Sequence, residues 1–288
     1  MKIGYNEGTM FKASTLAKDL ELCEKAGFDY IEVRLDKYFE YLQTHTLDEL
    51  KRFFAASHIK PHAINGVYIS RDLSFDKAET VAAFEKDVVE ACEVASSIGA
   101  PCFILVSPLN MDRITPWKDP VPDFDSTIVR AAAFAGKIAE KYHLNICFEL
   151  VGARYSACRS IDRAKKLIEA AGMPNLGYVF DSYNIFLNDC CTDYDKMRTV
   201  DLEKIFAVHI NDGIEVPVDQ LGSQANRRLC GEGYLPLKKY LAVLRDIGYD
   251  GMVSIETFCE EYYQESPEKI IPLAYQTTKA LMEECGCL

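Results

Sequence analysis

Short apolar runs alternate with longer amphipathic segments along the whole chain. The apolar runs are five to seven residues long and rich in β-branched and aromatic residues, which is typical of buried strands. They predict eight strands, over residues 2–6, 28–34, 60–65, 101–107, 144–150, 176–181, 205–210 and 252–256. Apolar residues recur with helical spacing between them and predict helices over 14–27, 46–57, 76–98, 124–142, 160–171, 235–247 and 267–284, with a weaker pattern over 193–204.

The alternation of strands and helices favours one fold class. Parallel strands joined by helical crossovers produce this order. Eight such units in 288 residues fit a closed (β/α)₈ TIM barrel, which typically takes about 250 residues. An open doubly wound sheet is the alternative, but no GxGxxG follows the first strand to support a dinucleotide site. Because no linker rich in Pro, Gly or Ser divides the chain, we expect one α/β barrel domain over residues 1–288.

Two irregular segments interrupt the alternation. Residues 107–123 follow the fourth strand, and residues 211–234 follow the seventh. In a barrel, the loops that follow strands form the face on which active sites are built. Long loops at that face are usually lids or substrate contacts. We therefore expect both segments to lie near the active site.

Charge and composition disfavour several classes of function. The chain has 32 Lys and Arg against 44 Asp and Glu, a net charge of −12, which argues against binding to nucleic acid or to anionic membranes. No run of about 18 uncharged apolar residues is present to span a bilayer. The first residues, MKIGYNEGTM, lead into a strand rather than a signal peptide. Eleven scattered cysteines without a CxxC pair indicate free thiols, so we expect a cytoplasmic protein.

The last four predicted strands each end in a side chain that can bind metal or transfer a proton: Glu149, Asp181, His209 and Glu256. The carboxyl ends of barrel strands converge, so these side chains should meet. Three carboxylates in one place repel each other unless a cation neutralises them. Each residue alone would be an ordinary polar side chain at a strand exit, but the four together predict one divalent ion. Three oxygen donors and one imidazole suit Mn²⁺, Co²⁺, Mg²⁺ or Zn²⁺.

The same strand ends carry a resemblance to a known family. The chain resembles the xylose-isomerase-like TIM barrels, a superfamily of sugar isomerases and epimerases, and within it most closely the inosose isomerases. The matching stretches run from residue 6 to residue 263 and are NEGTM, DLELCEKAGFDYIEVR, HIKPHAIN, FELVG, VFDSYN, HINDG and SIETFCEEYY. The resemblance implies that Glu149, Asp181, His209 and Glu256 bind the metal, with Mn²⁺ as the expected ion. It also implies that Glu149 and Glu256 are the catalytic acid and base.

Polar residues at the first three strand ends are candidates for binding substrate. Arg34 ends the second strand and can donate several hydrogen bonds to substrate oxygens. An ordinary ion pair with Glu32 or Asp36 is the alternative for this arginine. Asn6 and Asn65 end the first and third strands and could bind polyol hydroxyls, with capping of a loop backbone as the alternative.

The resemblance adds two further candidates and two departures from the family pattern. Relatives commonly carry a substrate-facing arginine before a GxG, which here is Arg228, with Arg227 as the alternative. Asn184 stands where relatives usually have a histidine, and an asparagine can donate a hydrogen bond but cannot titrate near neutral pH. The segment after the fifth strand offers Arg154 and Tyr155 where ketose epimerases carry an acidic residue. The second departure counts against a ketose 3-epimerase.

The reaction that these residues support is the movement of a carbonyl along a keto-polyol or sugar. A divalent ion that chelates the carbonyl and the adjacent hydroxyl stabilises an enediolate. A carboxylate then removes the α-proton and returns it to the neighbouring carbon. The alternatives are a ketose 3-epimerase, a keto-sugar lyase and a sugar-binding barrel without catalysis. Relatives are usually dimers or tetramers, so a homo-oligomer is compatible with the resemblance.

Overall fold

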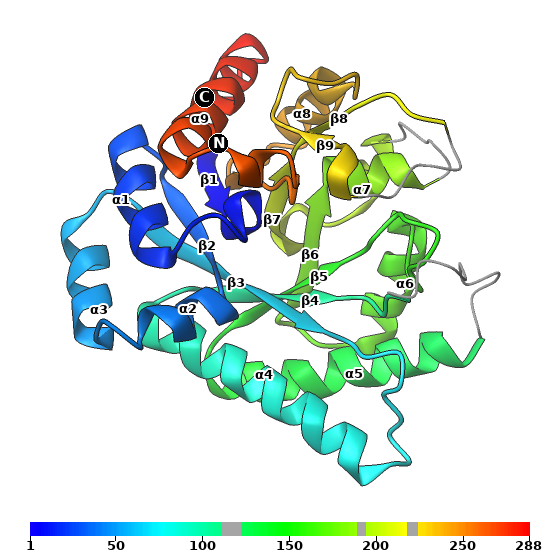
Figure 1. The fold of residues 1–288 in the computed structure, drawn as a ribbon. Helices are drawn as coiled ribbons and strands as arrows, with labels where there is room; N and C mark the ends of the chain where they lie inside the picture. Colours follow the sequence, from blue (N-terminus) through cyan, green and yellow to red (C-terminus); the bar gives the residue numbers. More distant parts are fainter. Residues whose placement is uncertain (111–121, 189–193, 218–223) are drawn as a thin grey trace.

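A barrel of eight parallel strands forms the centre of the molecule (Figure 1). The computed structural model describes residues 1–110, 122–188, 194–217 and 224–288. The strands run around the barrel in chain order, and the last pairs with β1 to close it. The predicted α/β TIM barrel is therefore confirmed. The strands are β1 (Lys2–Asn6), β2 (Tyr30–Arg34), β3 (Lys60–Tyr68), β4 (Cys102–Val106), β5 (Asn145–Glu149), β6 (Leu176–Asp181), β7 (Ile205–Ile210) and β10 (Met252–Ile255).

Helices cover the outside of the barrel (Figure 1). The seven helices that the sequence predicts from clear helical spacing all form, with ends within two residues of the expected positions. Capping residues explain this agreement: Thr15 accepts a hydrogen bond from Lys18 N at the start of the first helix, and Gly27 ends it with φ 99°. The helices are α1 (Leu16–Ala26), α3 (Leu47–Ala56), α4 (Ala78–Ile98), α5 (Pro122–Lys141), α6 (Ile161–Ala171), α8 (Leu237–Asp246) and α9 (Pro267–Glu284).

The segment 193–204 does not form the α-helix that its weak pattern suggests. Its described part folds as two 3₁₀ helices, η2 (Tyr194–Thr199) and η3 (Leu202–Lys204). Tyr194, Met197 and Val200 are its buried residues, and they are spaced by three. That spacing puts side chains on one face of a 3₁₀ helix, which has three residues per turn.

Several short elements at the carboxyl ends of the strands are not evident from the sequence. Two are the short helices α2 (Leu35–Tyr41) and α7 (Ser182–Leu187), and a third is the 3₁₀ helix η1 (Glu7–Met10). Strands β8 (Asp212–Gly213) and β9 (Arg227–Arg228) form a small antiparallel pair within the segment after β7. Residues 111–121 and 218–223 of the two irregular segments lie outside the described residues.

Strand β3 continues three residues past the end that the sequence predicts. Asn65-Gly66 is a sequence typical of a turn, but Val67 and Tyr68 pair with Leu105 and Val106 of β4. A register shift between Ile64 and Val67 absorbs the irregularity.

The two chain ends lie side by side (Figure 1). The amino group of Met1 donates a hydrogen bond to the carbonyl of Cys287 at 2.9 Å. Among the helices of the described residues, none combines the length and the apolar character that crossing a bilayer requires.

Candidate metal centre and active site

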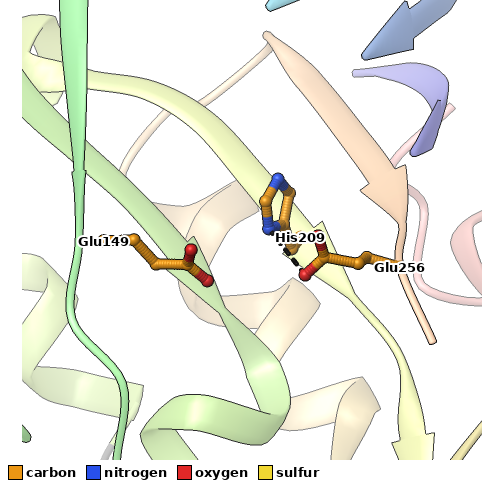
Figure 2. Close-up of side chains that lie close together, drawn as sticks. All are labelled: Glu149, His209 and Glu256. Atoms are coloured by element: carbon orange, nitrogen blue, oxygen red, sulfur yellow. Dashed lines mark ion pairs between the residues drawn. The ribbon is translucent and has the colours of Figure 1, made fainter. Parts of the chain in front are cut away.

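Three side chains from the carboxyl ends of β5, β7 and β10 meet inside the mouth of the barrel (Figure 2). Glu149 is the last residue of β5, His209 lies one residue before the end of β7, and Glu256 directly follows β10. Each offers a ligand atom, and these atoms lie within 4.8 Å of one another. All three residues are buried. The barrel thus brings together groups that are far apart in the chain, with Glu149 and Glu256 separated by 107 positions.

His209 is held with one ring nitrogen against a carboxylate and the other toward the centre. Its Nε2 lies 3.1 Å from Glu32 Oε1, and the carboxylate can only accept, so Nε2 carries the proton of this hydrogen bond. Its Nδ1 lies 3.3 Å from Glu256 Oε2 and makes no hydrogen bond with any described residue. Burial favours the neutral imidazole, but the charges of Glu32 and Glu256 outweigh it and raise the pKa of His209 well above its usual range.

The carboxylate of Glu149 lies across the centre from Glu256 and points toward it (Figure 2). Its Oε1 accepts a hydrogen bond from Asn184 Nδ2 at 3.0 Å. Burial, followed by the charge of Glu256, raises the pKa of Glu149 to about 8. A buried carboxylate of this kind holds a proton near neutral pH unless a cation is beside it.

Glu256 has more polar partners than Glu149 and ionises more easily. Its Oε1 accepts from Asn65 Nδ2 at 3.0 Å, and its Oε2 lies 3.5 Å from Arg227 Nη1. Burial opposes its ionised form, but the charges of His209 and Arg227 outweigh burial and lower the pKa of Glu256 to about 2. The two facing carboxyl groups therefore differ strongly in proton affinity.

Asp181 is next to this group but is engaged with other partners. Its Oδ1 caps α7 by accepting from the backbone N–H of Asn184 at 2.6 Å. Its Oδ2 accepts from Asn211 Nδ2 and from Arg227 Nη1, both at 2.9 Å. Of the four strand-end residues predicted from the sequence, three therefore form the cluster, and the fourth, Asp181, is paired with Arg227.

The two adjacent arginines of β9 point to different places. Arg227 is buried and reaches Asp181, the carbonyl of Glu256 and, at 5.1 Å, the ring of Tyr183. Arg228 instead donates to Glu261 Oε1 at 2.9 Å and to the carbonyl of Ala225. Arg227 is therefore the arginine that enters the centre.

The remaining substrate-binding candidates occupy different surroundings. Arg34 forms an ion pair with Asp36 at 3.0 Å and lies 4.0 Å from the ring of Phe11. Asn6 is fully buried and its Oδ1 accepts from the backbone N–H of Gly8. Asn65 donates both to Asn6 Oδ1 and to Glu256.

A pocket opens above the three clustered side chains. It includes Glu149, Glu256, Arg227, Asn65 and Asn184, so five of the candidates from the sequence line one cavity. Tyr68, Tyr155 and Phe258 give it aromatic walls, and of these three only Tyr155 was noted from the sequence. The pocket is lined by Asn65, Tyr68, Val106, Leu109, Glu149, Val151, Tyr155, Asn184, Arg227, Glu256 and Phe258.

The donor set of the centre fits a divalent cation. Two carboxylates and the Nδ1 of His209 converge, and that nitrogen is a buried ring atom without a hydrogen bond to the described residues. Ligand atoms that share one ion at about 2.0–2.2 Å lie within about 4.4 Å of each other, so small side-chain rotations would complete such a site. Nitrogen and carboxylate ligands suit Mn²⁺ and Zn²⁺.

Two residues that were not predicted from the sequence, Glu32 and Asn211, also touch members of the centre. Asn211 donates to Asp181, and Glu32 accepts from His209. The signal for Glu32 was present, because it is a charged residue in the middle of the apolar strand YIEVR. A charge in such a position has to find a partner inside the barrel.

Gly152 allows the segment after β5 to approach α7 closely, which places Asn184 beside Glu149. A Cβ at position 152 would lie 1.8 Å from the carbonyl oxygen of Asn184. We expect Gly152→Ala to displace α7, to lower the free energy of unfolding by about 1–3 kcal/mol or more, and to reduce catalytic activity. Urea denaturation and activity assays measure the two effects.

Gly99→Ala is the control, because its Cβ would meet nothing within 4 Å and its φ of 82° alone carries the strain. It should cost about 1–2 kcal/mol of stability and leave activity unchanged. Equal activity in the two variants would show that the contact between Gly152 and Asn184 is unimportant for the site.

Known proteins that are similar to this chain include one named as an isomerase and one named as an epimerase. An inosose isomerase of Halalkalibacterium halodurans is 35% identical over 283 residues, which covers 96% of this chain and 95% of that protein. A ketose 3-epimerase of Arthrobacter globiformis is 23% identical over 254 residues, which covers 86% of this chain and 79% of that protein. The crystal structure of IOLI protein with a bound zinc atom has a TM-score of 0.88 at 30% identity and covers 99% of both chains.

The family is identified by a match over most of the sequence. The family model described as xylose isomerase-like TIM barrel matches residues 20–281. Of the eight barrel strands, all except β1 lie within that range. The resemblance inferred from the motifs is confirmed, and the chain belongs to the xylose isomerase-like TIM barrel family.

Proposed function

We propose that this protein is a metal-dependent isomerase that moves the carbonyl group of an inosose by one carbon. The observation that carries the proposal is the pair of carboxylates of Glu149 and Glu256, which face each other across a pocket beside His209 Nδ1. The relative from Halalkalibacterium halodurans, named inosose isomerase, supports the isomerase prediction over nearly the full length of both chains.

The metal ion would be held by Glu149, His209 and Glu256. Asp181 would become a fourth ligand by releasing Arg227 and binding the ion instead. The ion supplies positive charge that stabilises the negative charge developing on the substrate oxygens as the α-proton leaves. Mn²⁺ is the ion that we propose, because carboxylates dominate the ligand set. The zinc atom of the IOLI structure makes Zn²⁺ the alternative. Metal analysis of the purified protein distinguishes the two.

Glu149 and Glu256 are the groups placed to move the proton. Each carboxylate lies at the wall of the pocket, within reach of a substrate carbon held between them. Asn184 fixes the orientation of Glu149 through its amide, and Asn65 does the same for Glu256. Arg227 supplies a fixed positive charge and hydrogen-bond donors at the floor of the pocket, where substrate oxygens would gather.

A ketose 3-epimerase is the second candidate, and the same facing carboxylates favour it. A proton removed by one carboxylate and returned to the same carbon by the other inverts that carbon. The relative named ketose 3-epimerase is 23% identical to this chain, compared with 35% for the inosose isomerase. Isomerisation is therefore our first proposal.

Proton exchange in D₂O tests the proposal. Metal-loaded protein is incubated with scyllo-inosose and, separately, with fructose, psicose and tagatose, and NMR follows deuterium uptake and product. We expect uptake with the inosose and a carbonyl shifted by one position. Uptake with a hexulose together with inversion at the exchanged carbon would identify an epimerase instead. Tight metal binding without exchange in any of the four would reject the proposed substrate class.

We also propose a cytoplasmic location. The nine described cysteines are free thiols, and eight of them are buried. Free thiols in this number are usual for proteins of reducing compartments. Fractionation of cells that produce the protein tests the location.

A further inference from the structure

Five buried side chains form a closed ring of contacts beneath the pocket. His209 Nδ1 lies 3.3 Å from Glu256 Oε2, and Glu256 Oε1 accepts from Asn65 Nδ2 at 3.0 Å. Asn65 Nδ2 also donates to Asn6 Oδ1 at 3.1 Å, and Asn6 Nδ2 donates to Glu32 Oε2 at 2.9 Å. The ring closes where His209 Nε2 meets Glu32 Oε1 at 3.1 Å. The five residues come from β1, β2, β3, β7 and the end of β10.

The hydrogen bonds of this ring have only one consistent direction. Both carboxylates can only accept, so each asparagine must turn its NH₂ group toward a carboxylate. Asn6 cannot flip, because its Oδ1 already accepts from Asn65 and from the backbone N–H of Gly8. Glu32 must therefore accept from Asn6 with one oxygen and from His209 with the other.

Glu32 acts on the centre only through these neighbours. It is fully buried and is not among the residues that line the pocket, so it does not touch a substrate. Its contact with Nε2 holds a proton on that nitrogen, so that Nδ1, which faces Glu149 and Glu256, is the nitrogen that would give up its proton to bind a metal ion. A carboxylate in this position also orients the ring and raises its basicity as a ligand.

We propose that Glu32 is a positioning residue that selects Nδ1 of His209 as the metal-binding atom and, through Asn6 and Asn65, couples this choice to the orientation of Glu256. The proposal rests on the proposed function, because it assumes that the centre holds a divalent ion. It assigns Asn6 and Asn65 to the support of the ligands.

Glu32→Gln is the informative substitution because it keeps the shape of the side chain but has only one hydrogen-bond acceptor oxygen, whereas Asn6 and His209 each donate to one. The new amide group must face either Asn6 or His209 with its NH₂. Toward His209 it would donate to Nε2 and move the ring proton to Nδ1, which then cannot bind metal. We expect Zn²⁺ and Mn²⁺ affinity, measured by competition with a chelating dye, to fall by about 10- to 100-fold.

¹⁵N NMR of the Zn²⁺-loaded protein with labelled histidine provides a second measurement. The His209 signals are assigned by their loss in His209→Asn. In the wild-type protein we expect zinc on Nδ1 and a proton on Nε2, and in Glu32→Gln a mixture of tautomers. Zinc bound through Nε2 in the wild-type protein would overturn the proposal, whether or not the variant folds.

Asp19→Asn is the matched control for the loss of a buried carboxylate. Asp19 is buried and pairs with Lys37 at 2.6 Å, outside the ring. It should lower thermal stability and leave metal affinity unchanged. The positioning role would be rejected if both variants lost metal affinity equally, or if Glu32→Gln bound metal as tightly as the wild-type protein. Neither result would reject the proposed function. A wild-type protein that binds neither ion would reject the proposed function and this role with it.

Discussion

Replacing Glu149 by glutamine is expected to lower the rate of proton exchange by about 10²–10⁴-fold, the usual contribution of a general base or acid. The amide keeps the shape of the side chain and an oxygen that can still bind a cation, but it cannot take up a proton. The bond from Asn184 Nδ2 to Oε1 can be retained, because the amide oxygen still accepts. The loss should therefore fall on kcat more than on KM.

Deuterium uptake and the metal content of the same samples are the measurements for this variant. Glu140→Gln is the control, because Glu140 is an exposed residue of α5 and the substitution makes the same change in charge. It should behave as the wild-type protein does. If Glu149→Gln binds a full complement of metal and still exchanges protons at the wild-type rate, Glu149 is not the catalytic acid or base. Glu256 would then be the next residue to test.

Removal of the metal by a chelator is expected to abolish proton exchange and to lower the melting temperature. An ion present at 100 to 1,000 times its dissociation constant stabilises the folded protein by about 2.7–4.1 kcal/mol. In a chain of this size that corresponds to a shift of about 5–10 °C. Without the ion, Glu149 should take up a proton near neutral pH, because burial and the charge of Glu256 raise its pKa to about 8.

Differential scanning calorimetry and re-addition of single ions measure this effect. His209→Asn is the control, because this variant is expected to bind no ion. Its melting temperature should therefore be the same with and without the chelator. Restoration of exchange by Mn²⁺ or by Zn²⁺ identifies the ion that supports activity. Unchanged exchange in protein shown by mass spectrometry to lack metal would contradict the proposed mechanism.

Local patterns of residue types are enough to predict the barrel and the chemistry available at its mouth. Strands and helices follow from the local spacing of apolar residues and from capping residues such as Thr15 and Gly27, which act within a few positions of the chain. The end of each strand is also a local feature, and in a closed parallel barrel all carboxyl ends lie at one face. The residue types at Glu149, His209 and Glu256 therefore predicted a common centre, because the topology alone brings them together.

The pairing of polar groups inside that centre depends instead on contacts across the folded barrel. Adjacent residues of a strand point in opposite directions, so Arg227 and Arg228 of β9 do not share their partners, and in the folded protein it is Arg227 that reaches Asp181. The contact of Glu32 with His209 joins residues 177 positions apart. No periodicity along the chain encodes such a pair, because it depends on the distance across the closed barrel and on the need of every buried charge for a partner.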